Sequence, residues 1–137
     1  MKLVSDKPAI PGNVNCSLYV PCFKLTIIGP QTPEEVKLIL IDPKVVELGN
    51  YNGVPHLMIP VVTEPSKAAA ALNWAVAEMT DRYKKFAERG VRDLQSYNDS
   101  VKAELEDDKV LPQVVIIIDE LADLMMAAPS QIEESIC

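Results

Sequence analysis

The stretch Val114-Val115-Ile116-Ile117-Ile118-Asp119-Glu120 decides the fold. Five consecutive β-branched apolar residues, entered through Leu111-Pro112 and closed by two acids, are typical of a β-strand. A strand that is apolar on both faces is normally covered on both faces, as in the parallel sheet of an α/β domain. The sequence therefore predicts a buried parallel strand over residues 114–118.

The two acids that close this strand are the first candidate functional residues. They follow its carboxyl end, where open α/β sheets place their ligands. In P-loop nucleotidases, the first acid at such a position holds the water shell of Mg²⁺, and the second orients or deprotonates the attacking water. Asp119 and Glu120 fit these two positions. The alternative interpretation is a buried strand that ends where charged residues return to solvent.

A second strand of the same kind is predicted over Lys37-Leu38-Ile39-Leu40-Ile41, and an acid, Asp42, again follows it. Pro43 cannot donate to a strand ladder, so pairing is expected to stop there. Helical sequence separates the two strands, which favours parallel pairing through crossover connections.

The intervening sequence predicts helices near residues 64–89 and 91–105. Thr63 is the expected N-cap of the first helix, with Glu64 and Pro65 in its first turn, and Gly90 ends it. One apolar stripe at helical spacing is expected to face the core; it comprises Leu72, Val76, Met79, Tyr83 and Phe86. Arg82 and Lys85 are spaced to pair with Glu78 and Asp81 on the exposed side, although a solvated charged face is the simpler interpretation.

Composition limits the classes of function. The chain has 137 residues and a net charge of −7, so it has no overall attraction for nucleic acid or for anionic membranes. Its three cysteines lack the CxxC spacing of a zinc site, and His56, the one histidine, has no second ligand nearby in sequence. We expect neither a disulfide framework nor a structural metal site, and no segment has the length of a membrane span.

Several motifs, in order, resemble the motor domain of FtsK/SpoIIIE-type DNA translocases, which are hexameric ATPases that pump double-stranded DNA. The last of them, Val115 to Met126, resembles the Walker B segment of that family. The earlier ones are Ile41-Asp42-Pro43-Lys44 with Glu47-Leu48, Tyr51 to Leu57, Pro60 to Thr63, Ala71 to Trp74 with Glu78-Met79, Arg82-Tyr83, Gly90 to Arg92 and Tyr97-Asn98.

The resemblance implies an α/β fold, specifically a partial RecA-like P-loop NTPase core. It also implies ATP and Mg²⁺ as cofactors, and double-stranded DNA and like subunits in a hexameric ring as partners. Within that site it assigns Asp119 to Mg²⁺ through water and Glu120 to activation of the hydrolytic water. The implied role is chromosome partition during cell division in the cytoplasm, although family members are often anchored in the membrane by an N-terminal region.

The sequence departs from the family pattern at its beginning. The family carries a Walker A loop, Gly-x-x-x-x-Gly-Lys-Ser/Thr, shortly before the strand at Lys37, and the chain contains no such sequence. Without that loop the β- and γ-phosphates lose their main binding site. We therefore expect residues 33–137 to be a partial motor domain that supplies the Walker B half of an ATP site and is inactive alone. Residues 1–32 are expected to be an irregular segment. The alternative is a non-catalytic homologue that binds intact motor subunits.

Overall fold

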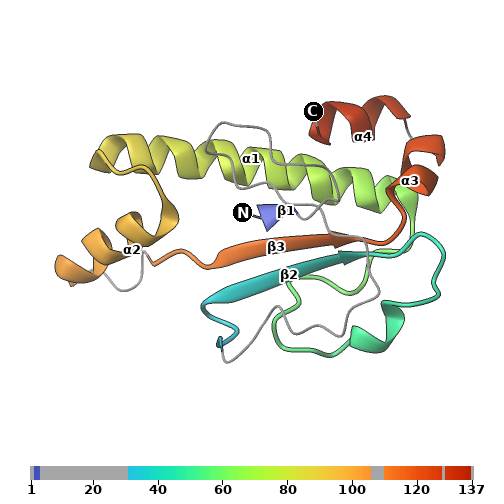
Figure 1. Ribbon diagram of the computed structural model, residues 1–137, viewed down its shortest axis with the longest axis horizontal. Helices are drawn as coiled ribbons and strands as arrows, with labels where there is room; N and C mark the ends of the chain where they lie inside the picture. Colours follow the sequence, from blue (N-terminus) through green and yellow to red (C-terminus); the bar gives the residue numbers. More distant parts are fainter. Residues whose placement is uncertain (1, 4–30, 106–109, 128, 137) are drawn as a thin grey trace.

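A parallel β-sheet forms the centre of the protein (Figure 1). The computed structural model describes residues 2–3, 31–105, 110–127 and 129–136. The strands are β1 (Lys2–Leu3), β2 (Val36–Ile41) and β3 (Gln113–Ile118), in the order β1-β3-β2. Both neighbours of β3 run parallel to it. The predicted α/β fold, with parallel strands near 37–41 and 114–118, is confirmed.

The free edge of β2 is partly covered by the chain that follows it. Leu38 forms a parallel bridge with Leu57, and Ile41 forms one with Val62. The Val62 amide donates to the Leu40 carbonyl at 2.9 Å, and the Asp42 amide donates to the Val62 carbonyl at 2.8 Å. Residues 57–62 therefore satisfy backbone groups that an open sheet edge would leave to solvent.

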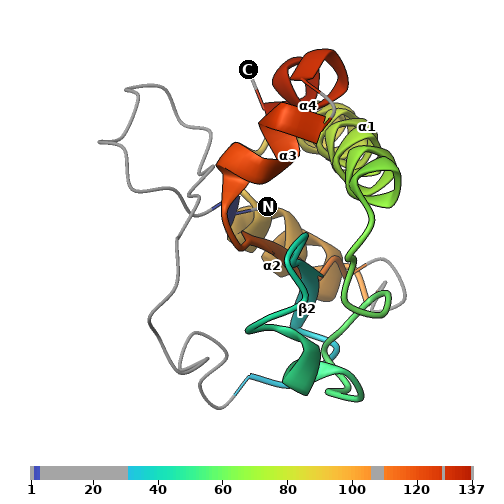
Figure 2. The same ribbon diagram turned by 90° about the vertical axis from the view of Figure 1, so that its right-hand side faces the viewer.

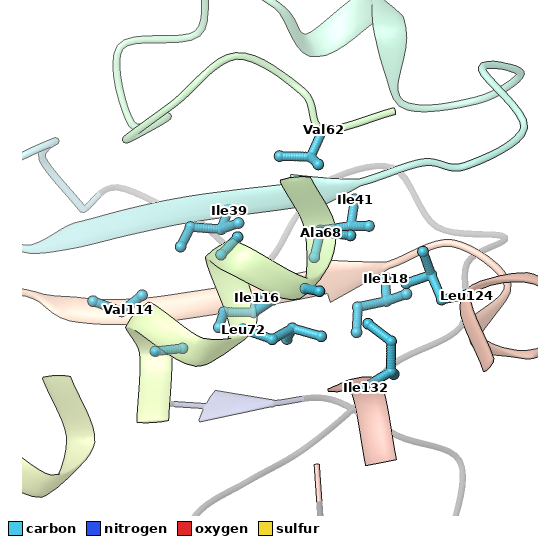
Figure 3. Close-up of a cluster of buried hydrophobic side chains, with 13 residues drawn as sticks. Ile39, Ile41, Val62, Ala68, Leu72, Val114, Ile116, Ile118, Leu124 and Ile132 are labelled. Atoms are coloured by element: carbon cyan, nitrogen blue, oxygen red, sulfur yellow. The ribbon is translucent and has the colours of Figure 1, made fainter. Parts of the chain in front are cut away.

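Alternation along the two long strands explains why both are apolar over nearly their whole length. On one face, Ile39 and Ile41 join Ile116 and Ile118 in a buried cluster that also contains Leu72 of a long helix (Figure 3). On the other face, the side chains of a second buried cluster come from both strands and from the loop after β2; they are Val36, Leu38, Leu40, Leu48, Val61, Val115 and Ile117. Each strand thus needs apolar residues on both faces, and only Lys37 of β2 and Gln113 of β3, near the strand starts, are polar.

Helices cover one face of the sheet (Figures 1 and 2). The long helix α1 (Pro65–Arg89) runs along that face, and α2 (Leu94–Ala103) lies near the carboxyl end of α1. The short helices α3 (Leu121–Ala127) and α4 (Pro129–Ile136) follow β3 directly, and α4 contacts both α1 and α3. The opposite face is covered by the loop that contains a 3-10 turn, η1 (Gly49–Tyr51).

The helix ends differ slightly from the prediction. Glu64, not Thr63, is the N-cap of α1, and Pro65 is its first residue, where a missing N–H has no consequence. Gly90 ends the helix in the left-handed conformation (φ 66°), as predicted. The second helix begins at Leu94 rather than at Val91, because the Asp93 side chain accepts a hydrogen bond from the Ser96 amide and caps it there.

The buried face of α1 differs from the predicted apolar stripe. Leu72 and Phe86 are buried as predicted, but Val76 and Met79 are only partly buried, and Tyr83 is 42% exposed. The helix instead packs small residues against the sheet, namely Ala68, Ala69, Ala71 and Ala75. Alanine carries a weak hydrophobic signal, so the apolar pattern placed the contact face too far toward Tyr83.

Arg82 is buried (5% exposed) although the sequence placed it on the solvent side. Its Nε donates to Glu78 Oε1 at 2.7 Å, and its Nη1 donates to the Pro112 carbonyl at 2.6 Å. The predicted pairing with Glu78 is present, but its role is different. The guanidinium ties α1 to the segment that enters β3, and both of these hydrogen bonds are charge-assisted.

Most of the segment 1–32, predicted to be irregular, lies outside the described residues. The part of this segment that is described near its start is the strand β1, in which Lys2 pairs with Val115 and Leu3 pairs with Ile116. Two residues are too few to carry a periodic signal, so the sequence did not predict this strand. Within the described ranges 31–105, 110–127 and 129–136, no helix combines the length and apolar character needed to cross a membrane.

Candidate functional site

The carboxyl ends of β2 and β3 lie side by side, at the right of Figure 1, and the acids that follow them form the candidate site. Ile41 is in register with Ile118, and the Asp119 amide donates to the Ile41 carbonyl at 2.8 Å. Asp42 and Asp119 therefore occupy equivalent positions on neighbouring parallel strands. Figure 1 also shows that the loop after β2 and the start of α3 meet at this end of the sheet.

Asp42 is fully buried and organises the loop after β2. Its Oδ2 accepts hydrogen bonds from the amides of Glu47 (3.1 Å) and Leu48 (3.0 Å), which folds residues 43–48 back toward the strand end. Its Oδ1 is buried without a hydrogen-bond partner among the described atoms. Val45 in the same loop has a φ of 58°, a strained conformation for a β-branched residue.

Asp119 is partly buried among other acids. Burial raises the pKa of its carboxyl above 3.8, and the negative charges of Glu47, Asp42 and Glu120 raise it further, while Lys44 lowers it. A carboxylate in such surroundings is poorly compensated by the protein. A bound cation would relieve this repulsion, so the electrostatics of Asp119 suit a position close to a metal ion.

Glu120 is exposed and sits at the turn into α3 with a φ of 56°. Its carboxylate accepts a hydrogen bond from the ammonium of Lys44, which also pairs with Asp123 at 3.3 Å. These contacts raise the pKa of Lys44, with the hydrogen bond to Glu120 as the largest cause and that to Asp123 as the next. Lys44 thus connects the loop after β2 to the beginning of α3.

The donor set at the strand ends fits Mg²⁺ held mainly through water. In the part of the chain that the structure describes, no three His, Cys, Asp or Glu side chains are grouped so that they could hold a metal ion together. Protein sites for Mg²⁺ in nucleotide enzymes use one or two carboxylates, several waters and the phosphates of the substrate. Asp119, partly buried with a raised pKa, is a carboxylate of the appropriate kind, and the buried Asp42 adds negative charge beside it.

The structure brings together more residues than the sequence predicted for this site. Asp119 and Glu120 lie at the end of β3, where they were expected. Lys44, which the sequence offered as a motif residue and as a candidate subunit-interface or coupling residue but not as a partner of Glu120, reaches Glu120 across 76 residues of sequence. The sequence did contain one signal for this grouping, namely the acid that follows each strand. Parallel neighbouring strands end on the same side of the sheet, so residues that follow them come close together. His56 lies elsewhere, and its Nε2 is 3.0 Å from the Gln31 carbonyl.

We predict that Asp119→Asn stabilises the folded chain at neutral pH. Because the pKa of Asp119 is raised, the folded state binds more protons than the unfolded state between 3.8 and the raised value, so stability falls as the pH rises through that window and stays lower above it. Removing the charge should raise Tm at pH 7 by about 2–5 °C. Thermal unfolding at pH 7 and well below pH 3.8 measures this.

The gain from Asp119→Asn should disappear well below pH 3.8, where the wild-type carboxyl is protonated in both the folded and the unfolded state. Asp99→Asn, at an exposed position on α2, is the matched control and should change Tm little at either pH. A lower Tm for Asp119→Asn at pH 7 would show that the ionised carboxylate is stabilised by its surroundings, contrary to the repulsion described above.

Comparison with known proteins agrees with the motifs. The sequence model of the FtsK/SpoIIIE family matches residues 20–137, which extends the similarity upstream of Pro33. A DNA translocase FtsK from Clostridium tetani is 59% identical over 120 residues, and one from Clostridium acetobutylicum is 62% identical over 120 residues. The DNA translocase SftA of Bacillus subtilis is 49% identical over 120 residues.

The chain spans only a small part of these relatives. Each alignment covers 88% of this chain, but 16% of the two clostridial proteins and 12% of SftA. The parallel sheet with its covering helices is consistent with a partial RecA-like core. A family match over residues 20–137 and identities near 60% to long relatives lead to one conclusion. The chain belongs to the FtsK/SpoIIIE family of DNA translocases.

Proposed function

We propose that this chain supplies the Walker B half of the ATP site in an ATP-dependent motor that translocates double-stranded DNA. One observation carries the proposal: Asp119 and Glu120 follow the central strand β3, at the carboxyl-end edge of the sheet, where Asp42 also follows β2. Open α/β sheets bind their ligands at this edge. Membership in a family whose relatives are named DNA translocases supports the same assignment.

The two acids have different proposed roles because their surroundings differ. Asp119, partly buried with a raised pKa, would orient the water shell of Mg²⁺. Glu120, exposed and adjacent, would orient the attacking water and accept its proton. When bound, Mg²⁺ neutralises the charge that develops on the transferred phosphoryl group.

The proposal assigns the binding of the β- and γ-phosphates to a part of the motor other than this segment. None of the 137 residues forms a Gly-x-x-x-x-Gly-Lys-Ser/Thr sequence, whose amides and lysine would cradle those phosphates. The chain alone is therefore proposed to lack ATPase activity. DNA contact is likewise assigned to a local loop or to parts of the motor outside this segment, because a net charge of −7 gives the segment no overall attraction for nucleic acid. The proposed assembly is a hexameric ring of like subunits in the cytoplasm.

The test is a chimera in which residues 20–137 replace the matching segment of the Clostridium tetani relative. We expect the purified chimera to hydrolyse ATP with stimulation by double-stranded DNA, since the segments are 59% identical. Asp119→Ala in the chimera should weaken binding of Mg-ATP by about ten-fold or more, the usual cost of disturbing a metal's surroundings. Titration with a fluorescent ATP analogue, with and without Mg²⁺, measures this.

The control is Asp99→Ala, which removes an exposed carboxylate on α2 and should leave Mg-ATP binding unchanged. If Asp119→Ala binds Mg-ATP as the unsubstituted chimera does, Asp119 is not near the metal and the Walker B assignment fails. A chimera that assembles into rings but hydrolyses no ATP would favour the alternative, a non-catalytic homologue that associates with intact motor subunits.

A further inference from the structure

An ion pair joins the two strand ends of the candidate site. The Lys44 ammonium, from the loop after β2, donates to the Glu120 carboxylate and lies 3.3 Å from Asp123 of α3. Both partners of the closer pair are about half exposed, with side-chain exposures of 47% and 46%. An exposed pair of this kind contributes little to folding stability. The ion pair therefore affects the orientation of the Glu120 carboxylate more than the stability of the fold.

The backbone on each side of this pair is constrained. Val45, next to Lys44, has a φ of 58°, and Glu120 itself has a φ of 56°. They are two of the three non-glycine residues with positive φ in the described part of the chain. Strained backbone of this type tends to collect at functional sites, where the surrounding structure holds it in place. Here the buried Asp42 supplies part of that support through its bonds to the amides of Glu47 and Leu48.

Lys44 also carries the opposite charge to its neighbours at this edge. The negative charges of Glu47, Asp42 and Glu120 act on Asp119, and Lys44 opposes them. Without the Lys44 ammonium, the Glu120 carboxylate would lose the hydrogen bond that links it to the loop after β2. With it, the carboxylate is held next to the end of β3.

We propose that Lys44 is a positioning residue that orients the Glu120 carboxylate, so that the loop after β2 sets where the base for ATP hydrolysis stands. This inference rests on the proposed function, because it assumes that Glu120 activates the water. It goes further by giving the Asp42-Pro43-Lys44 motif a role. Asp42 fixes the loop after β2 through its hydrogen bonds to loop amides, and Lys44 of that loop holds the Glu120 carboxylate.

The contact is tested first in the 137-residue chain, without ATP. We expect Lys44→Met to shift the side-chain carboxyl ¹³C resonances of Glu120 and Asp123. Lys85→Met is the matched control, since Lys85 forms a similarly exposed pair with Asp81 at 2.7 Å and should shift Asp81 while leaving Glu120 and Asp123 unchanged. Unchanged resonances of Glu120 in Lys44→Met would overturn the proposal, whatever the ATPase activity.

The role is tested in the chimeric motor by separating kcat from KM. Lys44→Met should lower kcat for ATP by about ten-fold, since misplacing a catalytic group by about 1 Å costs up to about a hundred-fold, while KM stays the same. Lys44→Arg, which keeps the charge, should recover most of the rate, and Lys85→Met should behave as the unsubstituted chimera. A merely structural role for Lys44 would not give this split with rescue by arginine.

The remaining outcomes are distinguishable. An unchanged or increased kcat in Lys44→Met, or a change in KM alone, would overturn the positioning role even if the resonances move. An unsubstituted chimera that folds but has no ATPase activity would overturn the proposed function, and the role of Lys44 with it. In that case the resonance shifts would still report whether the ion pair exists, so the two failures are separate.

Discussion

Glu120→Gln in the chimeric motor is expected to reduce DNA-stimulated ATP hydrolysis by about 100-fold or more, because general-base catalysis contributes about 10²–10⁴ to such reactions. Glutamine keeps the size of the side chain and its ability to hydrogen bond, but it cannot accept the proton of the attacking water. Glu120 lies next to Asp119 in sequence and is exposed at the strand end, where it can reach a water. Steady-state ATPase assays at saturating DNA measure the loss.

Binding of Mg-ATP should survive this substitution, since Asp119 remains. The expected pattern is therefore a large fall in kcat with binding affinity changed by less than about three-fold, which assigns Glu120 to the chemical step. Glu133→Gln, at an exposed position on α4, is the matched control and should keep full activity. A Glu120→Gln chimera that retains more than a third of the rate would show that another group activates the water.

The strands were the most predictable part of this fold. Residues 37–41 and 114–118 were predicted as strands, and the structure has Val36–Ile41 and Gln113–Ile118. The agreement is close because each strand is buried on both faces over most of its length, and runs of apolar residues such as 38–41 and 114–118 meet that requirement. The β1 strand was not predicted, since its two residues acquire strand geometry only by pairing with β3.

The site was only half predictable, for a reason that lies in its geometry. Asp119 and Glu120 are contiguous with a strong strand, so their place at its end follows from local sequence. Lys44 meets Glu120 only because β2 and β3 are parallel neighbours with Ile41 opposite Ile118. That register comes from tertiary pairing, and local sequence does not contain it. The buried hydrogen bonds of Asp42 to the loop amides depend on the same strand end.

The orientation of α1 shows a limit of apolar periodicity. The predicted stripe counted large apolar side chains and so included Tyr83, which is 42% exposed. The observed contact face contains Ala68, Leu72 and Ala75, all at most 2% exposed. Small residues let the helix lie close to the sheet, and Figure 3 shows Ala68 and Leu72 of α1 in the same cluster as the isoleucines of β2 and β3. Close packing, not side-chain size, therefore sets the face of this helix.

These two descriptions of α1 predict different effects of introducing a charge. Ala75→Asp should lower the free energy of unfolding of the 137-residue chain by roughly 3–5 kcal/mol, since an uncompensated buried charge costs about that much. Ala75 is 2% exposed and packs in the cluster that contains the β2 and β3 isoleucines. Tyr83→Asp should cost only about 1 kcal/mol or less, because the charge remains in solvent. Urea unfolding followed by circular dichroism measures both.

Ala77→Asp is the matched control for helix propensity, because it makes the same substitution at an exposed position half a turn away on α1. It should cost no more than about 1 kcal/mol, the propensity difference between alanine and aspartate together with weak repulsion from Asp81. Ala75→Asp should lower the free energy of unfolding far more than Ala77→Asp or Tyr83→Asp only if the alanine face of α1 contacts the sheet. The reverse order, with Tyr83→Asp the most damaging, would mean that the apolar stripe faces the core and that α1 is rotated about its axis relative to the structure described above.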